Sequence, residues 1–273
     1  MTSRRARARG VGVAMPASRQ QSRYGQPWTR KELILAFDLY CRIPFRKTKA
    51  SNPWVQQLAA LVGRSPASVA RKLGNFGAFD PQLQRENISG LTHTSRQDRE
   101  IWDEFHNDWN ALVYAAYKIR HSRGIGLVEQ ETDLAQPTGP SERLQPAKQR
   151  VHQSFFRQAV LSSYEWRCCI TGIAVPECLV ASHIIPWSKD EHRRADPTNG
   201  LCLSATFDRL FDAGLISISD QLTVQLSTTL KKSRDARTSA LLSVYDSAQI
   251  MRPRRFLPSL EALRWHRQKV FLG

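Results

Sequence analysis

Residues 167–219 read RCCITGIAVPECLVASHIIPWSKDEHRRADPTNGLCLSATFDRLFDAGLISIS and hold the densest set of structural signals in the chain. The apolar run Leu179–Ile185 predicts a strand, and the run Leu201–Leu203 predicts a second strand after a polar loop. Residues 204–213 then predict a short helix, which Gly214 ends. Two further short strands, at 215–219 and 222–226, predict another hairpin. The stretch therefore predicts a β-hairpin followed directly by a helix.

Three short motifs in this stretch resemble the HNH endonuclease family. They are SHIIPW at 182–187, NGL at 199–201 and DRLFDAGLI at 208–216, and they keep the order and spacing of that family. The resemblance covers roughly the last 120 residues. It implies a ββα-metal unit in which His183 is the general base, Asn199 holds the loop, and Asp208 replaces the third histidine of the family as a metal ligand.

The residue types also suit phosphodiester hydrolysis on chemical grounds. The reaction needs an activated water, and a neutral imidazole with an ordinary pKa near 6.5 is mostly a free base at pH 7. A divalent ion stabilises the transition-state charge and the leaving oxygen. A lone histidine in an apolar run is more often a core residue than a catalyst. The ordered set of His183, Asn199 and Asp208 favours the catalytic interpretation here.

An oxygen ligand at Asp208 favours a hard ion, so we expect Mg²⁺, with Mn²⁺ and Ni²⁺ as alternatives. The chain departs from the family pattern at Ser182, where many HNH enzymes have Asp or His as a second ligand. Asp212, one helical turn after Asp208, is either a further ligand or a helix residue that satisfies local backbone. The chain has five cysteines and no CxxC pair. A structural zinc on Cys168, Cys169, Cys178 and Cys202 is therefore the weaker alternative, and we expect these four to be small buried thiols that pack under the hairpin. Cys41 is the fifth cysteine.

The composition predicts a polyanionic partner. The 273 residues carry a formal net charge of +16 and a pI of about 10.2, which favours nucleic acid over a membrane. No apolar run approaches the ~18 residues that a membrane span needs. The unpatterned, odd cysteine count indicates a reducing compartment. We therefore expect a cytoplasmic, nucleoid-associated protein that binds double-stranded DNA, either as a monomer or as a homodimer.

Composition shifts along the chain predict an α+β protein with four segments. Residues 1–24 contain six arginines and no acid, and we expect a disordered basic arm. A targeting peptide and a start codon placed too far upstream are the alternatives. Residues 25–121 predict a helical DNA-recognition domain, residues 122–148 a linker, and residues 149–273 the nuclease domain. One helix is expected over 96–117.

The helical segment contains a helix-turn-helix outline. Thr29, Asn52 and Ser65 each stand at a helix N-cap, and the last two precede a proline. Two helices separated by a Gly-Arg-Ser turn predict that the second presents Ser68, Arg71 and Lys72 to DNA. The block also resembles the domain before the HNH unit in some bacterial restriction-type nucleases, where the pattern of KLGNF at 72–76 recurs. A helical bundle with solvated charges is the alternative.

The leading hypothesis is a metal-dependent DNA endonuclease of the restriction or defence type, with modified DNA as one candidate target. A second hypothesis is a DNA-binding regulator whose HNH unit has lost catalysis, because Ser182 replaces a ligand and the third histidine is absent. A third hypothesis is an RNA-directed nuclease toxin. It is weaker because helix-turn-helix patterns usually address duplex DNA.

Overall fold

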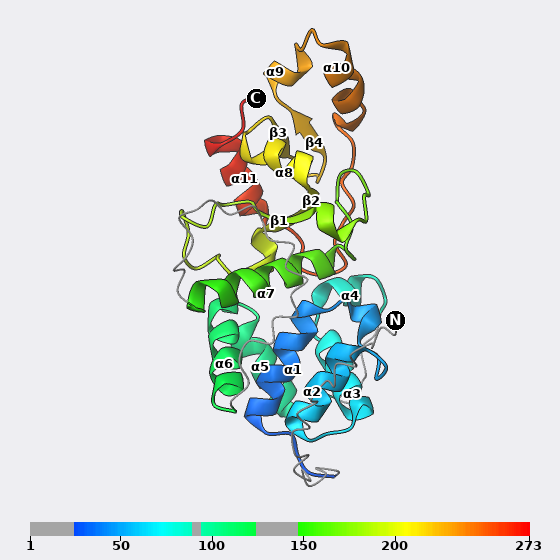
Figure 1. Ribbon diagram of the computed structural model, residues 1–273, viewed down its shortest axis with the longest axis vertical. Helices are drawn as coiled ribbons and strands as arrows, with labels where there is room; N and C mark the ends of the chain where they lie inside the picture. The colour runs from blue at the N-terminus through cyan, green and yellow to red at the C-terminus, as the bar shows by residue number, and fades with distance from the viewer. Residues whose placement is uncertain (1–24, 89–93, 124–146) are drawn as a thin grey trace, which may run out of the picture.

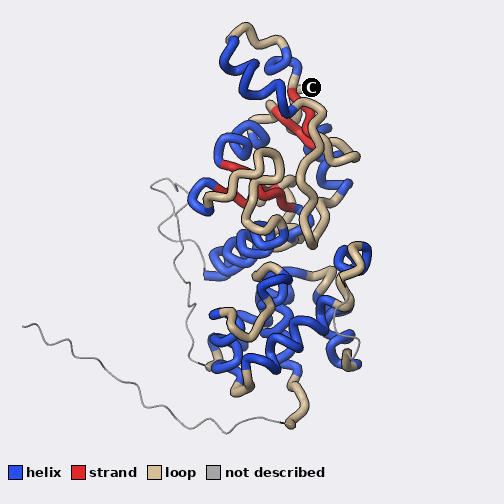
Figure 2. The backbone as a smooth tube through the Cα atoms, turned by 90° about the vertical axis from the view of Figure 1, so that its right-hand side faces the viewer, coloured by secondary structure: helices blue, strands red, loops and turns tan. Residues whose placement is uncertain are grey.

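The computed structural model describes residues 25–88, 94–123 and 147–273. A helical unit lies at one end and a mixed strand-and-helix unit at the other, with helix α7 between them (Figure 1). Among the described residues, the strands lie in the second unit (Figure 2). The predicted α+β class is confirmed. The basic arm at 1–24 and most of the predicted linker lie outside the described residues.

Six helices build the first unit, and side-chain caps begin most of them as the sequence predicts. Thr29 caps α1 in a reciprocal capping box with Glu32. Asn52 caps α2 and Ser65 caps α3, each with proline at the first helical position. The helices are α1 Arg30–Arg42, α2 Pro53–Val62, α3 Pro66–Gly77, α4 Pro81–Arg85, α5 Arg96–Phe105 and α6 Trp109–His121.

The expected single helix over 96–117 is wrong, because α5 ends at Phe105 and α6 starts at Trp109. The Asp108 side chain accepts a hydrogen bond from the Ala111 amide at 2.9 Å and so caps a new helix. An aspartate satisfies an N-terminal amide better at a cap than inside a helix. This break turns α6 back along the unit.

The helical unit packs around α1, which is buried along almost its whole length. Its acidic side chains are paired inside the unit. Asp38 is fully buried and accepts from Arg42 at 2.9 Å and from Arg120 at 2.6 Å. Phe37 lies in an aromatic cluster with the rings of Tyr40, Phe76, Trp102 and Trp109.

Helix α7 (Ala147–Ser163) belongs to both hydrophobic cores. Phe155 packs in the core of the helical unit, and its neighbour Phe156 packs in the core of the second unit. A second link is Arg255, which is 1% exposed and donates to the Tyr40 carbonyl at 2.5 Å and the Ile43 carbonyl at 2.6 Å. The two units therefore share packed elements. The boundaries predicted at 121 and 149 remain a prediction.

The second unit contains two antiparallel hairpins. In the first, Leu179 pairs with Ser204 and His183 pairs with Gly200. In the second, Ile216 pairs with Leu226. Helix α8 follows the first hairpin directly, as predicted. The elements are β1 Leu179–His183, β2 Gly200–Ser204, α8 Ala205–Asp212, β3 Ile216–Ile218, β4 Val224–Leu226, α9 Thr228–Lys231, α10 Ala236–Leu242 and α11 Leu260–Lys269.

Short 3-10 helices complete the fold at Phe45–Lys47, Pro176–Cys178, Pro197–Asn199 and Ser243–Tyr245. Helices α9 and α10 project at the top of the second unit in Figure 1. Among the helices of the described residues, none combines the length and the apolar character that crossing a bilayer requires.

Candidate active site

The first hairpin and α8 bring the three predicted site residues together. His183 is the last residue of β1, Asn199 immediately precedes β2, and Asp208 lies in α8. Gly200 pairs with His183 across the hairpin. A side chain at Gly200 would meet Val160 Cγ2 at 2.3 Å and Phe156 Cζ at 2.9 Å, so its absence lets α7 approach the hairpin closely.

The His183 ring is held on three sides. It stacks on Phe156 with a centroid distance of 3.6 Å and an interplanar angle of 9°, and the Trp187 ring meets it edge-on at 5.7 Å. Its Nε2 lies 3.1 Å from the carbonyl oxygen of Arg194. Because a carbonyl only accepts, Nε2 carries the hydrogen and Nδ1 keeps its lone pair. The hydrogen bond therefore selects the tautomer in which Nδ1 is the base.

Burial lowers the pKa of His183 to about 4, and the hydrogen bond to the Arg194 carbonyl opposes this shift. Taking a cation out of water is unfavourable, so the ring stays neutral over most of the acidic range. His183 is therefore an unprotonated imidazole at neutral pH.

Asn199 is 1% exposed and closes the loop that leaves β1. Its Oδ1 accepts from the Ile185 amide at 2.9 Å, and its Nδ2 donates to the Ile185 carbonyl at 3.0 Å. The Asn199 carbonyl also accepts from the Ile184 amide at 2.9 Å. These bonds hold the chain immediately after His183 and give a physical basis for the predicted loop-holding role.

Asp208 faces Ser182, the residue before His183 on β1. Ser182 is 3% exposed, and its hydroxyl oxygen has no hydrogen-bond partner of good geometry among the described residues. Burial raises the pKa of the Asp208 carboxyl. The nearby Ser182 hydroxyl opposes this rise but does not cancel it. The structure therefore places a buried hydroxyl next to a half-buried carboxyl.

Asp212 follows one turn later on α8. Partial burial of its carboxyl and the negative charge of Asp208 raise the pKa of Asp212 to about 6, although the residue has an exposed surface. Arg209, between the two acids in the sequence, acts in the opposite direction on both. The repulsion indicates that the two carboxyls lie close enough for a cation to relieve it.

This donor set fits a hard divalent ion held partly by other ligands. Within the described ranges, no group of three or more His, Cys, Asp and Glu side chains is arranged to hold a metal by itself. Mg²⁺ is usually bound through one or two carboxylates, with waters and substrate phosphates completing the shell. Asp208, Asp212 and the unpartnered Ser182 hydroxyl are all oxygen donors. They meet that requirement without a third acidic or histidine ligand.

Only some of the α3 side chains that are predicted to face DNA reach the surface. Arg71 is exposed and Ser68 is half-buried. Lys72 is not on an open face, and that prediction is wrong: it is 7% exposed and donates to Asp98 at 2.7 and 3.0 Å. Asn75 donates to the same carboxylate at 2.9 Å. Lys72 neutralises a buried acid inside the helical unit, which sequence spacing does not reveal.

The cysteines are all free thiols in the structure. Cys168, Cys169 and Cys202 are buried in the core under the hairpin, as predicted. The prediction is wrong for Cys178, which ends a 3-10 helix before β1 and is exposed. Burial raises the pKa values of Cys202 and Cys169 well above the ordinary thiol value. Cys202 and Cys169 are therefore packed neutral thiols at neutral pH.

Sequence reasoning missed three groups that shape the site: the Phe156 ring, the Arg194 carbonyl and the close approach at Gly200. No side-chain pattern marks a backbone carbonyl in a loop. The NGL motif could have pointed to Gly200, but its contact lies on α7, about 40 residues away in the sequence.

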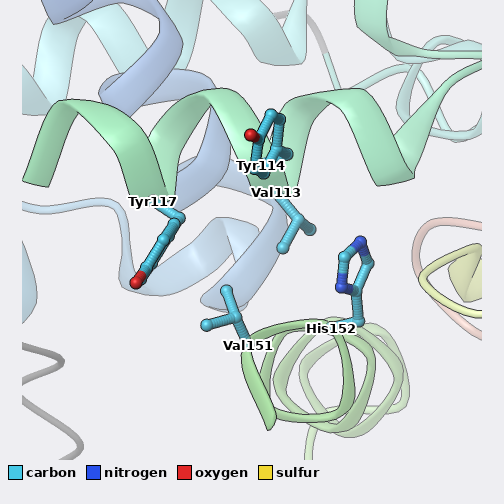
Figure 3. Close-up of a pocket in the computed structure, with 5 residues that line it drawn as sticks. All are labelled: Val113, Tyr114, Tyr117, Val151 and His152. Carbon is cyan, nitrogen blue, oxygen red and sulfur yellow. The ribbon is translucent and has the colours of Figure 1, made fainter. Parts of the chain in front are cut away.

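A small pocket elsewhere in the chain lies between α6 and α7 (Figure 3). Val113, Tyr114 and Tyr117 come from α6, and Val151 and His152 from α7. The lining is mostly apolar and does not include the site residues of the hairpin. We assign no chemistry to it.

Comparison with known proteins agrees with the hairpin geometry. The profile of a family described as HNH endonuclease matches residues 168–219, which contain β1, β2 and α8. No curated protein sequence matches the chain. Among solved structures, a modification-dependent TagI restriction endonuclease shares 23% identity at a TM-score of 0.29, over 42% of this chain and 37% of its own. The chain thus spans little more than a third of that enzyme. The family match and the hairpin–helix arrangement together show that this chain contains an HNH endonuclease domain.

Proposed function

We propose that the protein is a metal-dependent DNA endonuclease of the restriction or defence type. The observation that carries the proposal is the state of His183, a neutral imidazole whose Nε2 is held by the Arg194 carbonyl. Its Nδ1 is left as the basic atom, and Asp208 lies on the adjoining helix. A general base beside an acidic oxygen cluster is the combination that phosphodiester hydrolysis requires.

His183 takes the proton from the attacking water at Nδ1. Its low pKa means that the free ring is always available as a base at neutral pH but is a weak one. A bound phosphodiester places negative charge near the ring and favours the imidazolium form, so the basicity of His183 rises when the substrate is present. Nε2 keeps its hydrogen bond throughout, which preserves the orientation of the ring.

Asp208 and Asp212 would hold a divalent ion, and Ser182 would add a hydroxyl oxygen on the β1 side. When bound, the ion stabilises negative charge on the phosphate and on the leaving oxygen. The raised pKa of Asp212, about 6, keeps that carboxyl partly protonated at mildly acidic pH. The binding of a cation favours the ionised form, so ion binding releases a proton from this pair.

Double-stranded DNA is the proposed substrate. The net charge of +16 supports a polyanionic partner, and Arg71, exposed on α3, is a candidate phosphate contact. Lys72 is removed from this surface because it is engaged with Asp98. The restriction-type role follows the sequence resemblance of the helical block. Modified cytosine in the target belongs to the same proposal.

The direct test is cleavage of plasmid DNA by the purified full chain, with and without Mg²⁺, Mn²⁺ or Ni²⁺. Unmodified DNA, 5-methylcytosine DNA, 5-hydroxymethylcytosine DNA and structured RNA are compared under each condition. We expect metal-dependent cleavage of duplex DNA and a higher rate on one of the modified substrates. Binding without cleavage under every metal would favour a regulator. Preferential cleavage of RNA would favour the toxin hypothesis, and equal rates on all DNA substrates would refute the dependence on modification.

A further inference from the structure

The loop between β1 and β2, residues 186–196, carries the carbonyl that orients His183. This carbonyl belongs to Arg194, and the contact to His183 Nε2 is 3.1 Å. The loop is a run of turns between the end of β1 and the 3-10 helix at Pro197–Asn199. Bonds inside the loop hold part of it, because Arg194 donates to the Trp187 carbonyl at 3.2 Å and pairs with Glu191 at 3.0 Å. Contacts from outside the loop fix its position against the rest of the fold.

The helical unit supplies one set of contacts. Asn110, in the first turn of α6, donates through Nδ2 to the carbonyls of Glu191 and His192, each at 3.0 Å. Both groups are acceptors, so only the amide NH₂ of Asn110 can face them. Its Oδ1 is buried without a partner within the described residues, which shows that the amide orientation is set by the loop and not by the helix.

The loop also enters the core of the helical unit directly. Ala195, the residue after Arg194, is fully buried and packs in the same core as Trp109 and Phe155 of the helical unit. Burial raises the pKa of Asp196, and hydrogen bonds from Thr198 and the charges of Arg193 and His106 oppose this rise. The helical unit therefore holds the loop before Arg194 through Asn110 and after it through the burial of Ala195.

The opposite side of the loop is attached to the second unit. Arg193 donates to Glu261 in the first turn of α11 at 2.6 Å, and the Ser259 amide donates to the Thr198 carbonyl at 2.8 Å. The loop is therefore held between α6 and α11. Cutting either attachment removes one of the outer contacts that place the loop and its Arg194 carbonyl.

We propose that Asn110 is a positioning residue for the catalytic histidine, and that the helical unit is thereby part of the nuclease site. Asn110 holds the loop so that the Arg194 carbonyl fixes the tautomer and orientation of His183. The proposal rests on the proposed role of His183 as general base. It assigns the helical unit a task beyond contact with DNA, because cleavage depends on α6 even when DNA remains bound.

The test compares Asn110→Ala and Asn110→Asp in the full chain. Alanine removes both donated hydrogen bonds, and aspartate keeps the size but turns an oxygen toward two carbonyl oxygens. Asn107→Ala is the matched control, since Asn107 is an exposed asparagine in the turn before α6 and has no side-chain hydrogen bond within the described residues. Folding is checked by circular dichroism and thermal melting.

Small displacements of a catalytic group cost up to ~10²-fold in rate, so we expect kcat to fall about tenfold in Asn110→Ala and further in Asn110→Asp. DNA affinity should stay within twofold, and Asn107→Ala should match the wild type. A readout independent of activity is the ¹⁵N NMR signature of the His183 ring. It should show Nε2–H in the wild type and a mixture of tautomers in Asn110→Ala.

Three outcomes would overturn this inference, and the second of them would also overturn the proposed function. If His183→Ala abolishes cleavage while both Asn110 variants cleave like the wild type and keep Nε2–H on His183, Asn110 does not position the histidine. If His183→Ala itself cleaves normally, the general-base assignment has failed and the inference fails with it. A loss of DNA affinity equal to the loss of kcat would assign Asn110 to binding and would also overturn the proposal.

Discussion

Replacing Gly200 by alanine should displace the side chains of α7 that pack against the hairpin and against His183. Gly200 has a φ of −132° and a ψ of 145°, a conformation that any L-residue adopts, so the backbone does not require glycine here. The requirement comes from packing. An added Cβ would lie 2.3 Å from Val160 Cγ2 and 2.9 Å from Phe156 Cζ, well inside contact distance. Both neighbours are nearly fully buried on α7 and have little room to move.

The expected cost follows from overpacking, which typically destabilises a core by about 1–3 kcal/mol. With two buried neighbours displaced, we expect Gly200→Ala to lie at the upper end, about 3 kcal/mol. For a chain of this size, that corresponds to a fall in Tm of roughly 6–12 °C. The Phe156 ring stacks on His183, so its displacement should also lower the rate of DNA cleavage.

A double-mutant cycle in urea denaturation tests this reasoning. Val160→Ala alone removes buried methyl groups and should cost about 2 kcal/mol. The same change removes the closest clash of Gly200→Ala, so the double variant should be no less stable than Gly200→Ala alone. Independent costs would instead add to about 5 kcal/mol. Additivity within about 0.5 kcal/mol would refute the close approach of α7 as the reason for glycine at this position.

Other predictions concern the metal ligands, the helical unit and pH. Asp208→Ala should lose Mn²⁺ binding measured by calorimetry, whereas Asp208→His should keep part of it, and an unchanged affinity in the alanine variant would exclude the ligand role. Lys72→Met leaves Asp98 buried without its cation and should cost about 3 kcal/mol in urea denaturation with DNA affinity unchanged. Arg71→Ala should weaken DNA binding and leave the stability in urea unchanged. The dependence of log K on log salt concentration should become shallower by about 0.9. Burial lowers the pKa of His266 to about 4 from an ordinary 6.5, so the unfolded state binds the proton first and stability is lost as the pH is lowered from 6.5 to 4. The wild type should lose up to about 3 kcal/mol more than His266→Gln between those pH values, and equal losses would contradict the assignment.

Local signals in the sequence predicted the hairpin and the helix that carry the site. The apolar run ending at His183, the NGL motif and Gly214 each act through neighbouring residues, and β1, β2 and α8 lie where these signals place them. Helix caps at Thr29, Asn52 and Ser65 are equally local.

Contacts between distant residues could not be predicted in the same way. Spacing on α3 places Lys72 beside Arg71 in the sequence but does not reveal that Asp98, 26 positions later, captures its ammonium. A continuous apolar pattern also hid the break at Asp108, where a capping side chain competes with helix continuation.

The shared role of α7 was hidden for a related reason. Phe155 and Phe156 are adjacent in the sequence, and one packs on Trp109 while the other stacks on His183. Neighbouring residues on a helix point about 100° apart, so a helix between two cores can serve both. Helix α7, which begins the predicted nuclease domain, therefore also packs in the core of the helical unit.

The most direct test of the account is single-turnover cleavage of duplex DNA by the wild type and by His183→Ala and His183→Gln, at saturating Mg²⁺. DNA affinity and thermal melting are measured on the same samples. The account predicts a loss of ~10²–10⁴-fold in the cleavage rate of both variants with DNA affinity retained, because only the proton-accepting step is removed. Cleavage by either variant within a few-fold of the wild-type rate would contradict the assignment of His183 as the general base.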